Sequence, residues 1–187
     1  MNVFDFDNTI YSGDSTADFY IFSLKRHPRI LLQIPRLLYY TIRLYVFKIG
    51  TKTEFKEKMY LFLKHVDINR DLPDFWDSHI KNIKEFYLKI QKNDDIIISA
   101  SPEFLLKPIC ERLHIHNLIA SRVDCKSGKY SRVNCHGKEK VTRFREEFGN
   151  TEIGEFYSDS LSDTPLAILA KKSFIVKGNQ ISEWKFD

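Results

Sequence analysis

The chain has 187 residues, of which 43% are hydrophobic and 29% charged, and a formal net charge of +4. That length allows one good core with a modest appendage, and the composition excludes a disordered or collagen-like chain. The small net charge excludes a polyelectrolyte, so no nucleic-acid partner is expected. Three cysteines (Cys110, Cys125 and Cys135) lack metal-site spacing and predict reduced thiols in a cytoplasmic protein. Because Met1 leads straight into a predicted strand, no signal peptide is expected.

Two carboxylates mark the first predicted strand, which covers residues 1–10. Asp5 and Asp7 follow the apolar pair Val3-Phe4 within the run Asp5-Phe6-Asp7-Asn8-Thr9. Side chains alternate along a strand, so the two carboxylates share an orientation and converge on one crevice at the strand's carboxyl end. Converging carboxylates repel unless a cation lies between them, and Mg²⁺ prefers oxygen ligands. A carboxylate can also be the nucleophile that takes up a phosphoryl group. Alone, the pattern also fits a surface turn with two solvated aspartates.

Residues 15–91 follow a helical pattern with no convincing strand. Helices are predicted over 16–25, over 35–48 with Pro35 at the first position and Gly50 just past the end, and over 74–90 with Pro73 near the start. Thr51 to Glu54 fits a capping box. The apolar residues after it recur at helical spacing: Phe55, Met59, Phe62, Leu63 and Val66.

The largely apolar stretch 30–49 must be tested as a membrane span. It contains Pro35, Arg36, Arg43 and Lys48, so no uncharged run approaches the ~20 residues that a span requires. Each central arginine would cost roughly 2.5–3.5 kcal/mol on insertion. A transmembrane helix is therefore rejected. A basic, aromatic-rich helix lying on an anionic membrane surface remains open, beside packing of these apolar residues within the protein.

Short apolar strands and helices alternate from residue 92 onward. Strands are predicted over 96–99, 118–123, 154–158 and 174–177, with helices over 102–113, 138–148 and 166–170, and a hairpin turning at 126–129 and returning through 130–134. Ser101-Pro102 resembles an N-cap followed by proline at the first helical position. This alternation is typical of a parallel sheet covered on both faces.

Four motifs stand in one order along the chain: D-x-D-x-T from Asp5, the apolar run ending at Ser99, a lysine pair at 138 and 140, and D-x-x-x-D from Asp159 to Asp163. In this order they resemble the haloacid dehalogenase superfamily of phosphohydrolases, over nearly the whole chain. The resemblance is to the phosphoserine-phosphatase-like subgroup, which carries a helical cap after strand one. It implies an α/β fold with a Rossmann-like parallel-sheet core formed by residues 1–14 and 92–187. The inserted cap would comprise residues 15–91.

The same resemblance assigns roles to the acidic residues. Asp5 would be the nucleophile that forms an aspartyl-phosphate, and Asp7 the general acid and then the general base. Asp159 would complete a Mg²⁺ site with Asp5 and the main-chain carbonyl of Asp7. Asp163 would orient a metal-bound water or the lysine. A capped helix start is the plainer role for Asp159 and Asp163, and both roles can hold together.

The remaining candidates contact the phosphoryl group or the substrate. Ser99 is favoured over Ser101 as the hydroxyl that binds a phosphoryl oxygen, helped by the N–H of Ala100 at a helix start. Thr9, Asp14 and Ala100 are the candidate substrate-binding residues. Asp14 stands where phosphoserine phosphatases carry a glutamate.

Two lysines compete for the charge-neutralising role. The pattern Cys135-His136-Gly137-Lys138-Glu139-Lys140-Val141 matches relatives that select Lys140, and it is preferred. Spacing from Asp159 selects Lys138 instead.

The resemblance implies a Mg²⁺-dependent phosphatase acting on a small phosphorylated metabolite. It does not extend to a serine substrate, because residues 55–64 contain lysines but no arginine for a serine carboxylate, and Ser99-Ala100-Ser101 replaces Ser-Gly-Gly. One alternative is a phospholipid head-group phosphatase similar to the phosphatidylglycerophosphatases, working at a membrane surface. Another, of a different class, is a non-catalytic binding module with a basic cap.

Overall fold

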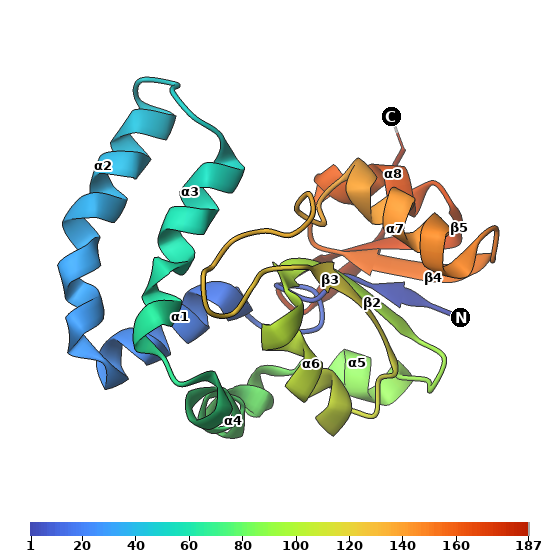
Figure 1. Cartoon of the computed structure of the whole chain (residues 1–187). Coiled ribbons are helices and arrows are strands. Elements are labelled where there is room, and N and C mark those ends of the chain that lie inside the picture. The colour runs from blue at the N-terminus through green and yellow to red at the C-terminus, as the bar shows by residue number, and fades with distance from the viewer. Residues whose placement is uncertain (187) are drawn as a thin grey trace.

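A mostly parallel sheet of six strands forms the centre of the molecule in a computed structural model, which describes residues 1–186 (Figure 1). The strand order is β3-β2-β1-β4-β5-β6, and of the described strands β6 alone runs antiparallel to its neighbour. The strands are β1 (Val3–Phe4), β2 (Ile96–Pro102), β3 (Asn117–Ser121), β4 (Ile153–Ser158), β5 (Ala170–Lys177) and β6 (Gln180–Glu183). The predicted α/β class with a Rossmann-like parallel sheet is confirmed.

Helices cover both faces of this sheet (Figure 1). They are α5 (Glu85–Ile90) and α6 (Glu103–Arg112) on one face, and α7 (Lys138–Phe148) and α8 (Thr164–Ala167) on the other. The alternation of side chains divides the apolar core accordingly: Phe4 belongs to the cluster that contains Leu105 of α6, and Val3 to the cluster that contains Phe144 of α7.

The register of β1 brings three chain segments to one edge of the sheet. Phe4 pairs with Ile97 of β2 on one side and with Tyr157 of β4 on the other. The N–H of Asp5 continues this pairing by donating to the Tyr157 carbonyl at 2.9 Å. The residues that follow Phe4, Ile97 and Tyr157 therefore meet at the carboxyl ends of the parallel strands, where such sheets bind ligands.

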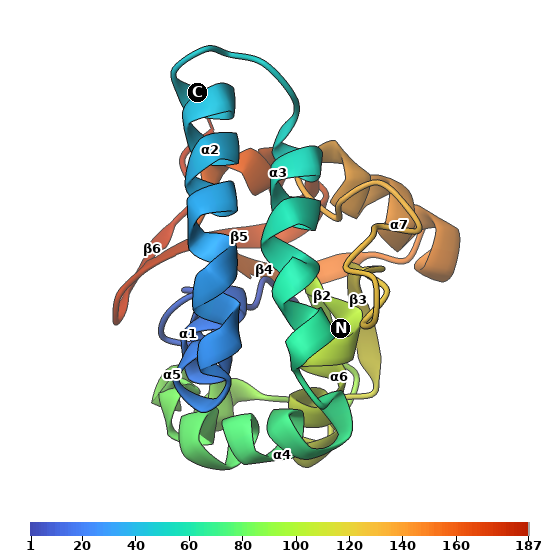
Figure 2. The same cartoon turned by 60° about the vertical axis from the view of Figure 1, so that its left-hand side comes forward.

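A run of helices, which we name the helical insertion (residues 15–90), separates β1 from β2. It contains α1 (Ser15–Arg26), α2 (Ile34–Tyr45), α3 (Lys52–Met59), α4 (Ile68–His79) and α5, with 3-10 segments at Pro28–Gln33, Tyr60–His65 and Ile80–Asn82. Helices α2 and α3 stand side by side and project away from the sheet (Figures 1 and 2). None of the α2 residues is buried. No helix within residues 1–186 is long and apolar enough to cross a membrane.

A fully buried carboxylate ties α1 to α4. Asp71 accepts a hydrogen bond from the Asp67 N–H at 3.0 Å and lies 2.6 Å from the His27 ring. Nε of Arg26 and Nε of Arg70 each lie 3.1 Å from Oδ1 of Asp71. A buried charge is tolerated when it is paired and hydrogen-bonded in this way, so Asp71 fixes the base of the helical insertion.

The helices predicted over 35–48 and 74–90 differ most from those in the structure. The helix predicted over 35–48 ends at Tyr45, three residues early, and Lys48 and Gly50 then adopt φ of 58° and 98°. The prediction of one helix over 74–90 was wrong. The Asp67 side chain caps α4 by accepting a hydrogen bond from the Asn69 N–H, so the helix starts at Ile68 and contains Pro73. The chain then becomes extended at Ile83–Lys84, where the Lys84 N–H donates to the Ile10 carbonyl at 2.8 Å.

The strand predictions also differ in part. The hairpin predicted to return through 130–134 is reduced to a single bridge between Val123 and Tyr130. Strand β2 runs past the predicted end to Pro102, and the edge strand β6 was not predicted, since its exposed residues carry no core pattern. By contrast, the capping box at Thr51 and the bounds of α7 are as predicted.

Candidate active site

A buried lysine bridges two buried carboxylates at the carboxyl end of β1. Nζ of Lys140 lies 2.7 Å from Oδ1 of Asp5 and 2.6 Å from Oδ2 of Asp163. Ser158, at the end of β4, donates to the same Asp163 oxygen at 2.8 Å. Burial lowers the pKa of Lys140, but the two carboxylates outweigh this effect and hold its pKa above the usual value. The lysine is therefore a fixed cation, while Lys138 is exposed.

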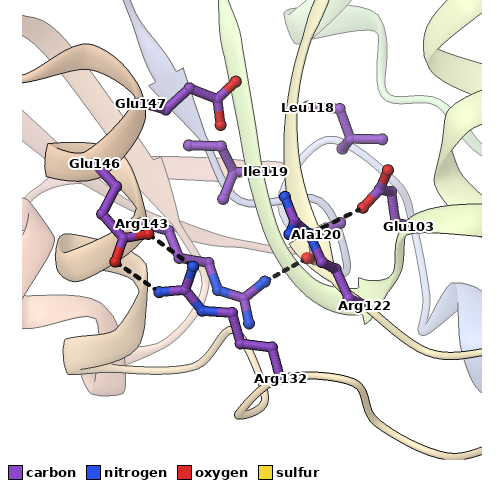
Figure 3. Close-up of a pocket in the computed structure, with 9 residues that line it drawn as sticks. All are labelled: Glu103, Leu118, Ile119, Ala120, Arg122, Arg132, Arg143, Glu146 and Glu147. Carbon is purple, nitrogen blue, oxygen red and sulfur yellow. Dashed lines mark hydrogen bonds and ion pairs between the residues drawn. The ribbon is translucent and has the colours of Figure 1, made fainter.

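Lys140 is held in place by the anchoring of α7. The helix begins after Gly137, whose combination of φ 58° and ψ −125° is easily adopted only by glycine. One turn beyond Lys140, the guanidinium of Arg143 donates to the Ala120 carbonyl of β3 at 2.6 Å (Figure 3). It also donates to the Val133 carbonyl. Arg132 makes a bidentate pair with Glu146 at 2.7 and 2.9 Å. Arg143 thus fixes α7 against β3, and Arg132 ties the segment before α7 to the same helix.

Asp7 is cradled by the start of α1 and the end of β2. Its carboxylate accepts a hydrogen bond from the Ser15 N–H at 2.7 Å and another from the Ser101 hydroxyl at 2.5 Å. Burial raises the pKa of Asp7 to about 6 and repulsion from Asp14 adds to the rise, while the bonds from Ser101 and Ser15 oppose it. A carboxyl group that titrates near neutrality can both give and take a proton.

The structure corrects the predicted role of Ser101. Residue 102, not 101, is the N-cap of α6, and no side chain caps that helix. Because β2 continues to Pro102, the Ser101 hydroxyl points toward Asp7 instead. Ser99 is almost fully buried at 1% exposure and its Oγ accepts the Ser101 N–H at 3.0 Å. Both hydroxyls and Ala100 border the same cavity.

Thr9 and Asp14, both predicted to bind substrate, differ in position: Thr9 lies outside the cavity lining, and Asp14 lines the cavity and also caps a helix. Thr9 is completely buried and does not border the cavity; its hydroxyl donates to Oδ2 of Asp5 at 3.5 Å. Thr9 thus lies behind Asp5, outside the lining of the cavity, and its predicted contact with a substrate stays a prediction. Asp14 does border the cavity, and its carboxylate also caps α1 by accepting the Ala17 N–H at 2.9 Å.

The carboxylates open onto a cavity of about 340 Å³ between the sheet edge and the helical insertion. From the core it is bordered by Asp5, Asp7, Ser99, Ala100, His136, Lys140, Asp159 and Asp163, among others. From the insertion it is bordered by Tyr45 of α2 and by Lys52, Phe55, Lys56, Met59 and Tyr60. Sequence reasoning missed Lys52 and Lys56. Their signal is that they share a helical face with Phe55 and Met59, at spacings of three and four.

A sequence profile of the haloacid dehalogenase-like hydrolases matches residues 3–167 of this chain. The chain belongs to that family. Over 81 residues it is also 33% identical to the protein CicA of Caulobacter vibrioides, a match that covers 40% of this chain and 36% of that protein. The chain thus matches little more than a third of this relative's length.

Three solved structures share the haloacid dehalogenase-like fold of this chain. A protein of unknown function from Bordetella pertussis Tohama I has a TM-score of 0.70 at 20% identity, covering 92% of this chain and 87% of that one. A phosphoserine phosphohydrolase-like protein from Francisella tularensis has a TM-score of 0.57 at 14% identity, with 92% and 86% covered. An apo phosphoserine phosphatase has a TM-score of 0.50 at 18% identity, with 91% and 82% covered.

Haloacid dehalogenase-like hydrolases generally use Mg²⁺, and the carboxylate oxygens that border this cavity are of the chemical kind that such an ion prefers. The Asp159 carboxyl lies within hydrogen-bonding reach of Asp5, and burial raises the pKa of both despite the nearby Lys140 cation. Oδ1 of Asp163 is buried without a hydrogen-bond partner among residues 1–186. No group of three or more acidic, histidine or cysteine side chains is arranged for a metal in that described part.

Proposed function

We propose that this protein is a Mg²⁺-dependent phosphomonoester hydrolase that acts through an aspartyl-phosphate on Asp5. The observation that carries the proposal is the buried lysine shared by Asp5 and Asp163, beside an Asp7 whose pKa is raised to about 6. A nucleophilic carboxylate, a fixed cation and a carboxyl group that titrates near neutrality are what phosphoryl transfer with acid–base assistance requires. Membership of the hydrolase family supports the same reaction class.

In the first step the Asp5 carboxylate attacks phosphorus and the bond from phosphorus to the leaving oxygen breaks. Asp7 gives its proton to that oxygen. In the second step water attacks the phosphorus of the aspartyl-phosphate and passes a proton to Asp7. The bond between phosphorus and Asp5 then breaks, which releases phosphate and restores both residues. Splitting the reaction lets one residue serve as acid and then as base.

Fixed charges and donors assist both steps. Lys140 offsets the negative charge of the transferred group, and the Ser99 hydroxyl with the Ala100 N–H holds a phosphoryl oxygen. Asp5, Asp159 and the Asp7 carbonyl would hold Mg²⁺, with Asp163 beside it. When bound, the ion would neutralise charge on the carboxylates and the phosphoryl oxygens.

The helical insertion would act as the cap that the sequence predicts over 15–91, with the core formed by residues 1–14 and 92–187. Its last helix, α5, covers one face of the sheet, so the helices before α5 would do the capping. The side chains of the insertion close one side of the cavity, so they would select the substrate and limit water. The substrate would be a small phosphomonoester met in the cytoplasm, either free or as the head group of a phospholipid.

Phosphate release tests the proposal directly. The purified protein is assayed with Mg²⁺ on an aryl phosphate, then on phosphoserine, sugar phosphates, nucleotides and phosphatidylglycerophosphate. We expect turnover on the aryl phosphate, and a loss of roughly 10⁴-fold or more in Asp5→Asn with unchanged thermal unfolding. A non-catalytic binding module would release no phosphate in any of these assays. That result, or full activity in Asp5→Asn, would reject the mechanism.

A further inference from the structure

A second buried lysine lies near the carboxyl ends of the parallel strands, outside the cavity. Lys84 immediately precedes α5 and is 8% exposed. Its Nζ donates to the Asn8 carbonyl at 2.5 Å and to the Gly178 carbonyl at 2.7 Å. Lys140 bonds to two carboxylates, whereas both of these partners of Lys84 are main-chain carbonyls. An ammonium group buried against neutral groups costs folding free energy, which points to a role at the site.

The two carbonyl groups belong to loops at the ends of different strands. Asn8 follows β1, and Gly178 lies in the turn between β5 and β6. Because β4 lies between β1 and β5 in the sheet, an ammonium group that contacts both loops lies beside the end of β4. The first residue after β4 is Asp159, which borders the cavity, and its carboxylate opposes the lowering of the Lys84 pKa by burial. Lys84 is therefore part of the edge of the sheet that forms the site.

The turn that Lys84 holds is the one by which the chain leaves Asp7. Asn8 adopts a φ of 56°, in the left-handed region that residues with a side chain seldom occupy. Its N–H donates to the Gly13 carbonyl at 2.9 Å, and its own carbonyl accepts the hydrogen bond from Lys84. Both polar groups of the Asn8 main chain are thus fixed, as an uncommon conformation requires. These bonds set the direction of the chain directly after Asp7.

The main chain of Lys84 is anchored to the same loop as its side chain. The Lys84 N–H donates to the Ile10 carbonyl at 2.8 Å. The preceding residue, Ile83, pairs with Tyr11 in an antiparallel bridge. The side chain of Lys84 therefore starts from a fixed point beside the turn that it holds, so its ammonium group can define the position of that turn.

We propose that Lys84 is a positioning residue, which holds the turn after Asp7 in the orientation that proton transfer to the leaving oxygen requires. Lys84 lies outside the cavity lining, whereas its partner Asn8 borders the cavity, so Lys84 acts through its neighbours and not on the substrate. The inference rests on the proposed phosphatase function, because it names a further residue on which the same site depends. Without the ammonium group Asp7 is still present, but the chain that carries it is less constrained, and proton transfer is the step that loses most.

Leaving-group release, measured by rapid quench with Mg²⁺ on an alkyl and on an aryl phosphate, tests the inference. Lys84→Met keeps most of the apolar part of the side chain and removes the ammonium group. We expect the first step to slow roughly 10–10²-fold on the alkyl phosphate and less than roughly threefold on the aryl phosphate, because only the alkyl leaving oxygen needs a proton. Lys89→Met is the matched control, since Lys89 belongs to α5 and its side chain is 73% exposed, and it should match the wild type on both substrates.

The ratio of the two losses does not depend on how much of the variant is folded, because unfolded chains lower both rates equally. A lysine that only stabilises the fold would leave this ratio unchanged, and that result would overturn the inference. Lys84→Gln is the second variant, whose shorter amide has no charge, and it should show the same selective loss on the alkyl phosphate.

A double-mutant cycle tests whether Lys84 acts through Asp7. In the Asp7→Asn background, Lys84→Met should slow release from the alkyl phosphate by less than roughly threefold, because the acid that Lys84 positions is already absent. The full additional loss in that background would overturn the inference. Release by the wild type that both Lys84 variants leave unaltered would overturn this inference alone. No release by the wild type on either substrate would overturn the proposed phosphatase and this inference with it.

Discussion

Lys140 and Asp5 form a buried ion pair, with Nζ 2.7 Å from Oδ1, between residues that lie 135 positions apart in the chain. The pair joins the first turn of α7 to the end of β1, and it extends to Asp163. The fold itself therefore holds the proposed nucleophile against its cation.

Lys140→Met should lower kcat by roughly 10²–10³-fold, because the charge of the transferred group loses its fixed counterion. Lys138→Met is the matched control, since Lys138 lies on the same turn but is exposed, and it should retain full activity. Aryl-phosphate turnover and thermal unfolding of both variants check this. Loss of activity in Lys138→Met with full activity in Lys140→Met would reverse the assignment.

Asp7→Asn should slow phosphoryl transfer by roughly 10²–10⁴-fold on alkyl phosphates, whose leaving oxygen needs a proton. On an aryl phosphate with a good leaving group the loss in that first step should be much smaller. Rapid-quench measurement of leaving-group release on both substrates checks the difference. Equal losses on both would mean that Asp7 does not act as the general acid.

Ser101→Ala should move the pH profile of kcat/KM to higher pH. The Ser101 hydroxyl bond lowers the pKa of Asp7, so its removal raises that pKa further above about 6. Asp7 must be protonated for the first step, and the protonated fraction falls as pH rises through its pKa. The alkaline limb should therefore shift upward, while Ser99→Ala should raise KM without this shift. If the alkaline limb of Ser101→Ala stays where it is or moves to lower pH, the Ser101 hydroxyl does not set the pKa of the catalytic acid.

Activity should require Mg²⁺, and excess Ca²⁺ should suppress it. The oxygen set of Asp5, Asp159 and the Asp7 carbonyl suits a small hard cation, whereas Ca²⁺ takes more ligands at longer distances and would misplace the nucleophile. Phosphate release after exhaustive chelation, and after titration with each metal, provides the measurement. Undiminished turnover in chelator would show that the carboxylates work without an ion.

Asp71→Asn should lower the free energy of unfolding by roughly 3 kcal/mol at neutral pH, because it removes the carboxylate that pairs with Arg26, His27 and Arg70. Burial raises the pKa of Asp71, but the bonds from His27 and Arg70 outweigh it and leave the pKa below the usual value. A depressed pKa contributes stability above the unfolded value of about 3.9, and that stability is lost as pH falls further.

Urea unfolding at neutral and acid pH measures both effects. The wild-type chain should lose stability below about pH 4, and Asp71→Asn should lose less over the same interval. Asp74→Asn is the control, since Asp74 also pairs with Arg26 but is 45% exposed, and it should cost under about 1 kcal/mol. Equal costs for the two variants would show that burial of Asp71 adds nothing.

Local sequence signals predicted most of the regular elements. The apolar runs 96–99 and 154–158 became strands, as did 118–121 of the run predicted over 118–123. The capping box at Thr51 and the helix over 138–148 formed where they were predicted. Each depends on neighbours within one or two turns. The predictions were wrong where contacts with distant parts of the chain override the local pattern. At Ile83–Lys84, for example, the backbone pairs with Ile10 and Tyr11 and so interrupts a predicted helix.

The order D-x-D, Ser99, lysine and D-x-x-x-D was enough to indicate the family by resemblance. The acidic candidates could be found from the sequence alone, because both acidic pairs follow apolar runs that form neighbouring strands. The tertiary structure decided which side chains meet. Lys138 and Lys140 share one turn, but only packing of Arg143 and Phe144 against the core turns Lys140 inward. Likewise, which residues of α2 are exposed depends on which side of that helix packs against α3. Side chains two residues apart on a helix point nearly opposite ways, so a local pattern allows both choices and long-range packing selects one.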